Sequence, residues 1–306
     1  MALPLRPPCV LAPLGPALAS RTRGAVSQPH GPPGAPSGIL LADKPAGITS
    51  HDVVARARHA LGIRKVGHAG TLDPFATGLL ILLVGRATRL QRFFMALAKT
   101  YEVTAQLGAT STTGDTEGEI VRTGVLPGDP IAPRLGRIRQ RPPAYSAVKV
   151  DGERAYARAR RGEAVELPER EVEIFGWDQL WREGNRMSLR IACSSGTYIR
   201  SLIADLGDAY CLELRRTDIG PFSVEGAWPT QGPAALLDPF SACRLFTPTI
   251  EIDDAAAADL AHGRALAAPG DAPLVLLVDR GSGAPRALAE RRDGAGGATL
   301  RPILGA

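Results

Sequence analysis

A single carboxylate stands out in the stretch GHAGTLDPFATGLL, residues 67–80. From Val66 to Gly85 the only formal charge belongs to Asp73, and glycines and apolar residues surround it. The proline that follows holds Asp73 in extended backbone, and the glycines let a partner approach the chain closely. A carboxylate is costly to bury in such surroundings without a cationic partner. Asp73 is therefore a candidate catalytic residue. The alternative is a turn aspartate that accepts hydrogen bonds from nearby backbone N–H groups.

Arg200 is the candidate partner of this carboxylate. It lies in the first turn of a helix predicted in TYIRSLIADLG, where the helix dipole disfavours a cation. A buried carboxylate such as Asp73 would compensate and would itself be kept ionised by the guanidinium. The alternative is a solvated surface arginine.

Two tyrosines and one histidine are further candidates. Tyr101 and Tyr198 are suited to stack on a flat substrate, as aromatic side chains stack on unpaired bases, or else they are core residues. His68 precedes Asp73 by five residues, and no other His or Cys is placed to share a metal ion with it. Structural and phosphate-facing roles for His68 both stay open.

These residues need a framework that mixes strands and helices. Alternation in TYEVTAQLG places Tyr101, Val103, Ala105 and Leu107 on one covered face of a strand. Other strands are predicted at GILLADKP (38–45), LLILLVG (79–85), MSLRIAC (187–193) and PLVLLVD (273–279). Helices are predicted at His51–Leu61 with Thr49 as cap and Gly62 as stop, at 87–97, at 198–207 and, rich in alanine and acids, at Ile250–Gly263. The polar stretch ATSTTGDTEGEI, residues 109–120, is predicted to be a loop.

Composition limits the classes of protein that are possible. The chain has 306 residues, 44% of them hydrophobic and 22% charged, and a net charge of +5, which permits a nucleic-acid partner. No apolar run is long enough to cross a bilayer, so no membrane partner is expected. The four cysteines have no paired spacing, which argues against a zinc site or a disulfide framework and favours a cytoplasmic protein.

Three regions follow from shifts in composition. Residues 1–37 are rich in Pro, Ala, Gly and Arg and contain no acidic residue, so we interpret them as a disordered extension. An organellar transit peptide and a misplaced start codon are alternatives for this region, and it lacks the apolar core of a secretory signal. Residues 38–245 are predicted to form the main domain, and residues 246–306 a small C-terminal domain.

A basic segment suits contact with a phosphate backbone. From Arg134 to Arg161 there are nine Lys or Arg residues against two acids, Asp151 and Glu153, with Tyr145 and Tyr156 among them. A solvated charged face is the alternative. The chain has no P-loop, no G-x-G-x-x-G after a strand and no H-E-x-x-H, so an enzyme of this sequence is expected to use side chains with neither cofactor nor metal.

Read in order, several blocks resemble the TruB family of bacterial tRNA pseudouridine synthases. They are DKPAGITSHDVV, KVGHAGTLDPFATGLL, KTYEV, RPPAYSAVKVDGERAYARARRG, SSGTYIRSLIADLG and LRRTDIGPF, within about residues 38 to 225. The resemblance implies an α/β (α+β) pseudouridine synthase catalytic fold with a mixed β-sheet, plus a small C-terminal PUA-like RNA-binding domain. The C-terminal region departs from the family, because it is short, acidic in its helix and lacks a strong motif.

The resemblance also implies roles for the matching residues. Asp73 of LDP would be catalytic, and Tyr101 of KTYEV would stack on the target base and help to remove a proton. The remaining implied substrate-binding residues are Tyr198 and Arg200 of TYIR, with Arg200 paired to Asp73, then His68 holding the splayed RNA loop, Leu214 lining the pocket and Lys44 supporting the catalytic loop.

The implied activity is isomerisation of the T-loop uridine U55 of tRNA to pseudouridine by a cytoplasmic, monomeric enzyme that binds the tRNA T-arm. Base flipping would expose the uridine, and the basic segment would hold the RNA. A guide-RNA-dependent synthase of the same fold and a non-catalytic tRNA-folding chaperone are the alternatives. A cofactor-free carboxylate hydrolase would need a second carboxylate near Asp73, and no candidate for one stands out in the sequence.

Overall fold

The protein is described here by a computed structural model. It covers residues 36–129, 131–143, 145–146, 149–150, 152–155, 158, 161–163, 167–262, 264–294 and 297–306. Ala35–Ala306 form one compact unit. The disordered extension predicted for residues 1–37 lies outside the described residues except for Pro36 and Ser37.

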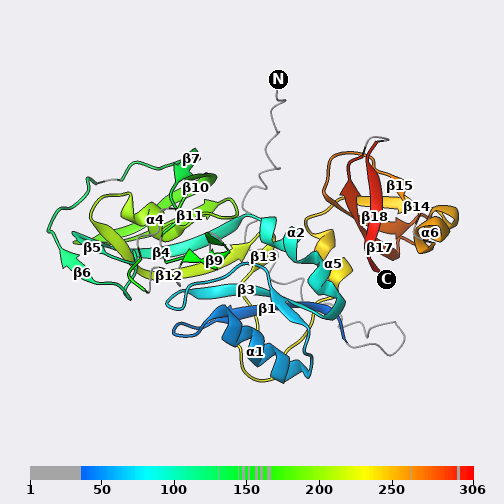
Figure 1. Cartoon of the computed structure of the whole chain (residues 1–306), viewed down its shortest axis with the longest axis horizontal. Coiled ribbons are helices and arrows are strands. Elements are labelled where there is room, and N and C mark those ends of the chain that lie inside the picture. The colour runs from blue at the N-terminus through cyan, green and yellow to red at the C-terminus, as the bar shows by residue number, and fades with distance from the viewer. Residues whose placement is uncertain are drawn as a thin grey trace. The chain divides into compact units, whose positions relative to one another are not determined.

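The larger sheet has nine strands (Figure 1). Their order is β1-β3-β12-β4-β11-β10-β7, with β2 paired to β3 and β13 paired to β12. The β3–β12 pair is parallel and the other pairs are antiparallel, so the sheet is mixed, as the sequence predicted. The strands are β1 (Gly38–Lys44), β2 (Val66–His68), β3 (Thr77–Val84), β4 (Lys99–Leu107), β7 (Gly136–Gln140), β10 (Arg170–Glu183), β11 (Arg186–Cys193), β12 (Ala209–Ile219) and β13 (Phe222–Ser223).

Burial explains the two strand patterns that the sequence shows. β3 is buried from Gly78 onward, and its successive side chains enter two different apolar clusters, with Leu79 and Ile81 in one and Leu80 and Leu82 in the other. A strand covered on both faces has no reason to alternate. In β4, by contrast, burial alternates strictly with Tyr101 on the covered face, which confirms the prediction made from TYEVTAQLG.

The helices begin and end where local chemistry directs. α1 starts after Thr49, whose hydroxyl accepts from the Asp52 N–H while the Asp52 carboxylate accepts from the Thr49 N–H; the helix stops at Gly62, which has φ of 68°. The prediction of this helix is confirmed. The helix predicted at 87–97 is a 3₁₀ helix followed by a short α-helix, and the one predicted at 198–207 ends earlier. The helical segments are α1 (Ser50–Leu61), η2 (Gly85–Leu90), α2 (Gln91–Ala96), α4 (Ile199–Ala204), α5 (Pro239–Arg244) and α6 (Asp254–Ala261).

A second sheet of five strands follows in the order β14-β16-β17-β18-β15 (Figure 1). The helix predicted at Ile250–Gly263 was wrong at its start. Ile250 and Ile252 belong to a strand that pairs with β16, and α6 begins only after Asp253, whose carboxylate accepts from the Ala256 N–H. The boundary predicted at 245/246 stays a prediction. The strands are β14 (Thr249–Ile252), β15 (Leu266–Ala267), β16 (Leu274–Asp279), β17 (Pro285–Arg292) and β18 (Thr299–Gly305).

Two small hairpins complete the fold. The loop predicted at 109–120 instead pairs at its ends, as β5 (Ala109–Ser111) with β6 (Ile120–Arg122). β8 (Lys149–Val150) pairs with β9 (Glu153–Arg154) within the basic segment.

Candidate active site

The loop that carries Asp73 joins β2 to β3 and is tied down on both sides of the carboxylate. On one side the Leu72 N–H donates to Ser50 Oγ at 2.9 Å, and that hydroxyl donates back to the Leu72 carbonyl. On the other side the Pro74 carbonyl accepts from Lys44 Nζ at 3.1 Å. The backbone around Asp73 is therefore fixed by side chains of α1 and β1.

Lys44, to which the resemblance gives support of the catalytic loop, lies close to that loop. It is fully buried at the end of β1, and its Nζ also donates to the Pro45 and Ile48 carbonyls at 2.9 and 2.8 Å. Burial lowers the pKa of its ammonium to about 8. Since one of its three acceptors is the carbonyl next to Asp73, the contacts agree with support of the loop.

Asp73 and Arg200 form the ion pair that the sequence predicted. Arg200 Nε lies 2.9 Å from Asp73 Oδ2, and the two side chains are 4% and 35% exposed. The rest of the guanidinium is also occupied, because Nη1 donates to the Thr113 carbonyl at 2.7 Å and Nη2 donates to the Tyr145 carbonyl at 2.9 Å. An arginine held by two backbone carbonyls thus lies in ion-pair contact with a carboxylate that solvent, and hence a substrate, can still reach.

A second carboxylate, Asp115, shares the same guanidinium. Its Oδ2 lies 3.3 Å from Arg200 Nη1, its side chain is as buried as that of Arg200, and it also accepts from the Thr113 hydroxyl and the Glu117 N–H. Sequence analysis found no convincing second catalytic carboxylate near Asp73, and it did not identify Asp115 as a partner of Arg200. Asp115 lies in the hairpin that was predicted to be a plain loop, where nothing in its spacing points to Arg200.

The electrostatics of Asp73 differ from expectation. Burial raises the pKa of its carboxyl above the usual aspartate value, the Arg200 charge opposes that rise, and the nearby Asp115 adds to it. The expectation that Arg200 alone sets the charge state was therefore incomplete. A carboxylate with a raised pKa is a stronger base than an ordinary aspartate while it is ionised.

An apolar wall lies beside this pair. Tyr101 and Leu214 are both buried, and they belong to one hydrophobic cluster that also contains Leu72 and Ala76 from the Asp73 loop. Burial raises the pKa of the Tyr101 hydroxyl. The structure thus brings together four of the predicted residues, Asp73, Arg200, Tyr101 and Leu214, in a setting that suits an aromatic base.

Tyr198 begins α4 and is half-buried. Its backbone N–H and carbonyl are held by the Oε1 and Nε2 of the buried Gln140, both at 2.8 Å, and the Arg170 guanidinium lies 5.5 Å from the centre of its ring. Gln140 ends β7, which lies within the basic segment. This amide clamp, which sequence analysis missed, fixes the start of the helix that carries Arg200.

His68 ends β2 and contacts a second histidine. The His51 and His68 rings meet edge to face with centroids 5.6 Å apart, and the His68 carbonyl accepts from Gln91 Nε2 at 2.8 Å. The described contacts place His68 on the strand leading to the Asp73 loop.

The basic segment has more acidic partners than its own sequence suggests. Arg158 and Arg161 both pair with Glu163, and Arg137 and Arg141 pair with Glu171 and Glu169, glutamates that follow the segment. These pairs are exposed, so each is worth little and can exchange for a phosphate.

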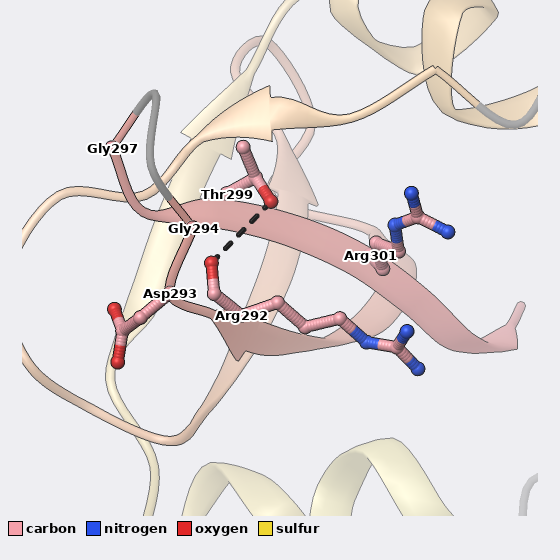
Figure 2. Close-up of a pocket in the computed structure, with 6 residues that line it drawn as sticks. All are labelled: Arg292, Asp293, Gly294, Gly297, Thr299 and Arg301. Carbon is pink, nitrogen blue, oxygen red and sulfur yellow. Dashed lines mark hydrogen bonds between the residues drawn. The ribbon is translucent and has the colours of Figure 1, made fainter.

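Other candidate sites are weaker. A cavity of about 380 Å³ opens on the second sheet, and Figure 2 shows the guanidinium groups of two of its arginines on one side and Asp293 on the other. It contains none of the predicted site residues, since its lining consists of Arg292, Asp293, Gly294, Gly297, Thr299 and Arg301. Over the described residues no cluster of three or more His, Cys, Asp or Glu side chains is arranged to hold a metal ion. Within the same part of the chain, no helix combines the length and apolarity that crossing a bilayer requires.

Comparison with known proteins gives a consistent family. The N-terminal domain of the TruB family pseudouridylate synthases matches residues 58–199. The chain is 47% identical over 209 residues to tRNA pseudouridine synthase B of Corynebacterium efficiens, covering 63% of this chain and 70% of that protein. It is 45% identical over 276 residues to the protein of the same name from Leifsonia xyli subsp. xyli, covering 80% and 90%.

A solved structure shares the fold. The chain superposes on a chain from the crystal structure of a Cbf5-Nop10-Gar1 complex with a TM-score of 0.63 and 27% identity, covering 87% of this chain and 83% of that one. Fold and extended sequence identity point the same way, and the chain belongs to the TruB family of pseudouridylate synthases.

Proposed function

We propose that this chain is a tRNA pseudouridine synthase that converts the T-loop uridine U55 of tRNA to pseudouridine. The two relatives described above, from Corynebacterium efficiens and Leifsonia xyli subsp. xyli, carry the name tRNA pseudouridine synthase B. The observation that carries the proposal is the contact of 2.9 Å between Asp73 and the buried Arg200, which leaves the carboxylate partly open to solvent. The guide-RNA-dependent alternative is not favoured. The chain is 27% identical to the chain from the Cbf5-Nop10-Gar1 complex, but 47% and 45% identical to the two relatives named tRNA pseudouridine synthase B.

The reaction is an isomerisation, so its atoms balance without an outside reagent. The bond between N1 of the base and C1′ of the sugar breaks, the base turns, and C5 bonds to C1′. The C5 proton then leaves and N1 gains one. Asp73 would act at the sugar, by attack on C1′ or by removal of a sugar proton. Both routes need the ionised carboxylate that the Arg200 charge favours.

The detached base must be held while it turns. Tyr101 and Leu214 supply a stacking ring and an apolar wall within the cluster that also contains Leu72. Stacking of a base on an aromatic side chain is worth about 1–3 kcal/mol. The uridine must first leave the folded T-arm, at a cost of a few kcal/mol that backbone contacts offset. We assign those contacts to the basic segment, with Tyr198 and His68 at the edge of the site.

The test is incubation of the purified chain with an unmodified tRNA transcript, followed by a chemical assay for pseudouridine at each position. Wild type is expected to modify the T-loop uridine without guide RNA or a second protein. Asp73→Asn is expected to bind the tRNA and to lose activity by about 10³-fold or more. Activity that persists in Asp73→Asn contradicts the mechanism, and a requirement for guide RNA contradicts the stand-alone enzyme.

We also propose that the chain acts as a monomer in the cytoplasm. Cys193, Cys211 and Cys243 are buried as free thiols, which suits a reducing compartment. Light scattering of the purified chain is expected to give the mass of one copy, and a dimer mass at micromolar concentration would refute the monomer.

A further inference from the structure

Arg216 is a buried cation for which the reaction described above has no use. It lies on β12 with 1% of its surface exposed, between β3 on one side and β4 on the other. Among the ion pairs of the described residues, none includes Arg216. A buried guanidinium without a carboxylate is costly unless its N–H groups are satisfied, so its acceptors show what it is for.

Those acceptors lie near the start of the catalytic loop and in the strand after it. Arg216 Nε donates to the carbonyl of Leu79 in β3 at 2.7 Å, and Nη2 donates to the carbonyl of Gly70 near the start of the loop at 3.1 Å. Nη1 lies 3.5 Å from the Thr71 carbonyl. One side chain thus links the start of the loop that presents Asp73 to the strand that follows it.

Gly78 shows that this approach is built into the backbone. It pairs with Arg216 in the parallel ladder, has φ of 105°, and a Cβ placed on it would lie 2.3 Å from the Arg216 carbonyl oxygen. No side chain fits there. Gly70, with φ of 109°, would direct its Cβ to within 3.7 Å of Arg216 Nη1. The residue that approaches the backbone closely at Gly78 is therefore Arg216.

On its other side Arg216 meets Tyr101. The two residues are directly opposite each other in the antiparallel ladder of β12 and β4. The positive charge of Arg216 lowers the pKa of the Tyr101 hydroxyl, against the larger rise that burial causes. Arg216 thus contacts both the loop of the proposed catalytic carboxylate and the proposed stacking tyrosine.

We propose that Arg216 is a positioning residue that sets the Asp73 loop and the Tyr101 hydroxyl in one fixed geometry. This rests on the proposed function. When C5 has bonded to C1′, the C5–H bond breaks, its electron pair restores the double bond of the ring, and the proton passes to a base. For the Tyr101 oxygen to accept that proton, Tyr101 must be ionised and held at C5; the Arg216 charge favours the phenolate against the opposing effect of burial.

The test compares Arg216→Met, Arg216→Lys and, as matched control, Arg190→Met. Arg190 lies on β11, one strand beyond β4, and pairs with Glu102 at an exposed position, so its loss is expected to leave activity and stability near wild type. Each protein is assayed for kcat and KM on tRNA transcripts made with ordinary uridine and with uridine deuterated at C5. Circular dichroism and tRNA affinity are measured in parallel.

Arg216→Met is expected to lose about a hundredfold in kcat, as misplaced reacting groups do, with tRNA affinity near wild type. Its deuterium isotope effect is expected to exceed that of wild type, because proton removal becomes slower. Arg216→Lys, which keeps the positive charge but not the several N–H donors of the guanidinium, is expected to recover part of the loss. A merely structural role would lower the melting temperature and leave the isotope effect unchanged, and that result overturns the proposal.

Two further outcomes distinguish a folding defect, and a failure of the proposed function, from a failure of the positioning role. If Arg216→Met does not fold, Arg216→Lys carries the test, and wild-type kcat with a wild-type isotope effect in that variant overturns the proposal. If wild type itself forms no pseudouridine, the proposed function fails first. If wild type is active and the Arg216 variants have wild-type kcat and isotope effects, the positioning role is refuted and the proposed function still stands.

Discussion

Charged side chains differ in burial and in number of partners between the surroundings of Asp73 and the second sheet. Near Asp73, Arg200 serves two carboxylates and Arg216 serves only carbonyls, and both guanidinium groups are buried. In and beside the second sheet, Arg264 pairs with Asp259 while 74% exposed, and Arg286 pairs with Asp279 at a half-exposed position. The first region shares a buried cation among several partners, whereas every described pair of the second sheet keeps at least one member exposed, including the pairs of the buried Glu290 with Arg92 and Arg292.

The buried charges near Asp73 hold side chains in a fixed geometry, whereas the exposed pairs of the second sheet mainly keep the surface soluble. A buried ion pair is seldom a source of net stability, but removal of one partner strands the other, so its geometry is strictly held. An exposed pair contributes roughly 0–1 kcal/mol and tolerates change. Chemistry that depends on a fixed carboxylate belongs to the first kind of setting, and this is why we place the reaction at Asp73 and not at the arginines of the second sheet.

The largest expected effect comes from Arg200→Met. The substitution leaves Asp73 and Asp115 close together without their shared cation, and breaking a buried pair in this way costs about 3–5 kcal/mol. Denaturant unfolding should show that loss, and kcat should fall with it. Arg264→Met, the matched change in an exposed pair, should cost less than about 1 kcal/mol. Equal costs for the two variants would remove the distinction between the regions.

The next effect concerns two glycines with positive φ. Gly78→Ala should destabilise the protein by about 2–4 kcal/mol, because its Cβ meets the Arg216 backbone in addition to the cost of the left-handed conformation. Gly270→Ala, with φ of 70° and nothing within 4 Å of its Cβ, should cost only about 1–2 kcal/mol. Melting curves of both variants test the comparison, and a cost for Gly270→Ala as large as that for Gly78→Ala would contradict it.

The smallest effect is a pair of opposite pH dependences. The pKa of Asp73 is raised by burial, so its contribution to stability is present below the unfolded value and is lost as pH rises through the folded value. The pKa of Asp279 is lowered by hydrogen bonds from Arg286 and Ser282, so its contribution is present at neutral pH and is lost as pH falls.

At neutral pH, Asp73→Asn should therefore raise the melting temperature, whereas Asp279→Asn should lower it. Both differences should shrink as the pH falls into the range where aspartate protonates. Melting temperatures of wild type and the two variants across this range provide the measurement. A melting temperature of Asp73→Asn below that of wild type at neutral pH would show that Arg200, not burial, dominates at this carboxylate.

Local signals predicted much of the framework. The reciprocal contacts of Thr49 and Asp52, and Gly62 at the other end, delimit α1 within a dozen residues, and the alternation in β4 identifies its buried face. The same kind of signal misled at Ile250, where an alanine-rich run hid a short strand that exists because β16 is there to pair with it.

Partners of charged residues were harder to predict. A signal for Arg216 was present, since residues two apart on a strand share a face and Leu214 had been placed in the pocket. No such signal existed for Asp115, because its link to Arg200 joins a hairpin to a helix that is distant in the chain.

The amino-acid sequence by itself determined the secondary structure that depends on neighbouring residues, the uncharged setting of Asp73, and the motifs that place the chain in its family. Only the tertiary structure decided which cation meets which oxygen. Helix caps and strand alternation depend on residues a few positions apart, whereas the contacts of Arg200 and Arg216 exist because β3, β12 and β4 lie side by side in the sheet. Burial then sets the energy of each contact, and burial is a property of the whole fold.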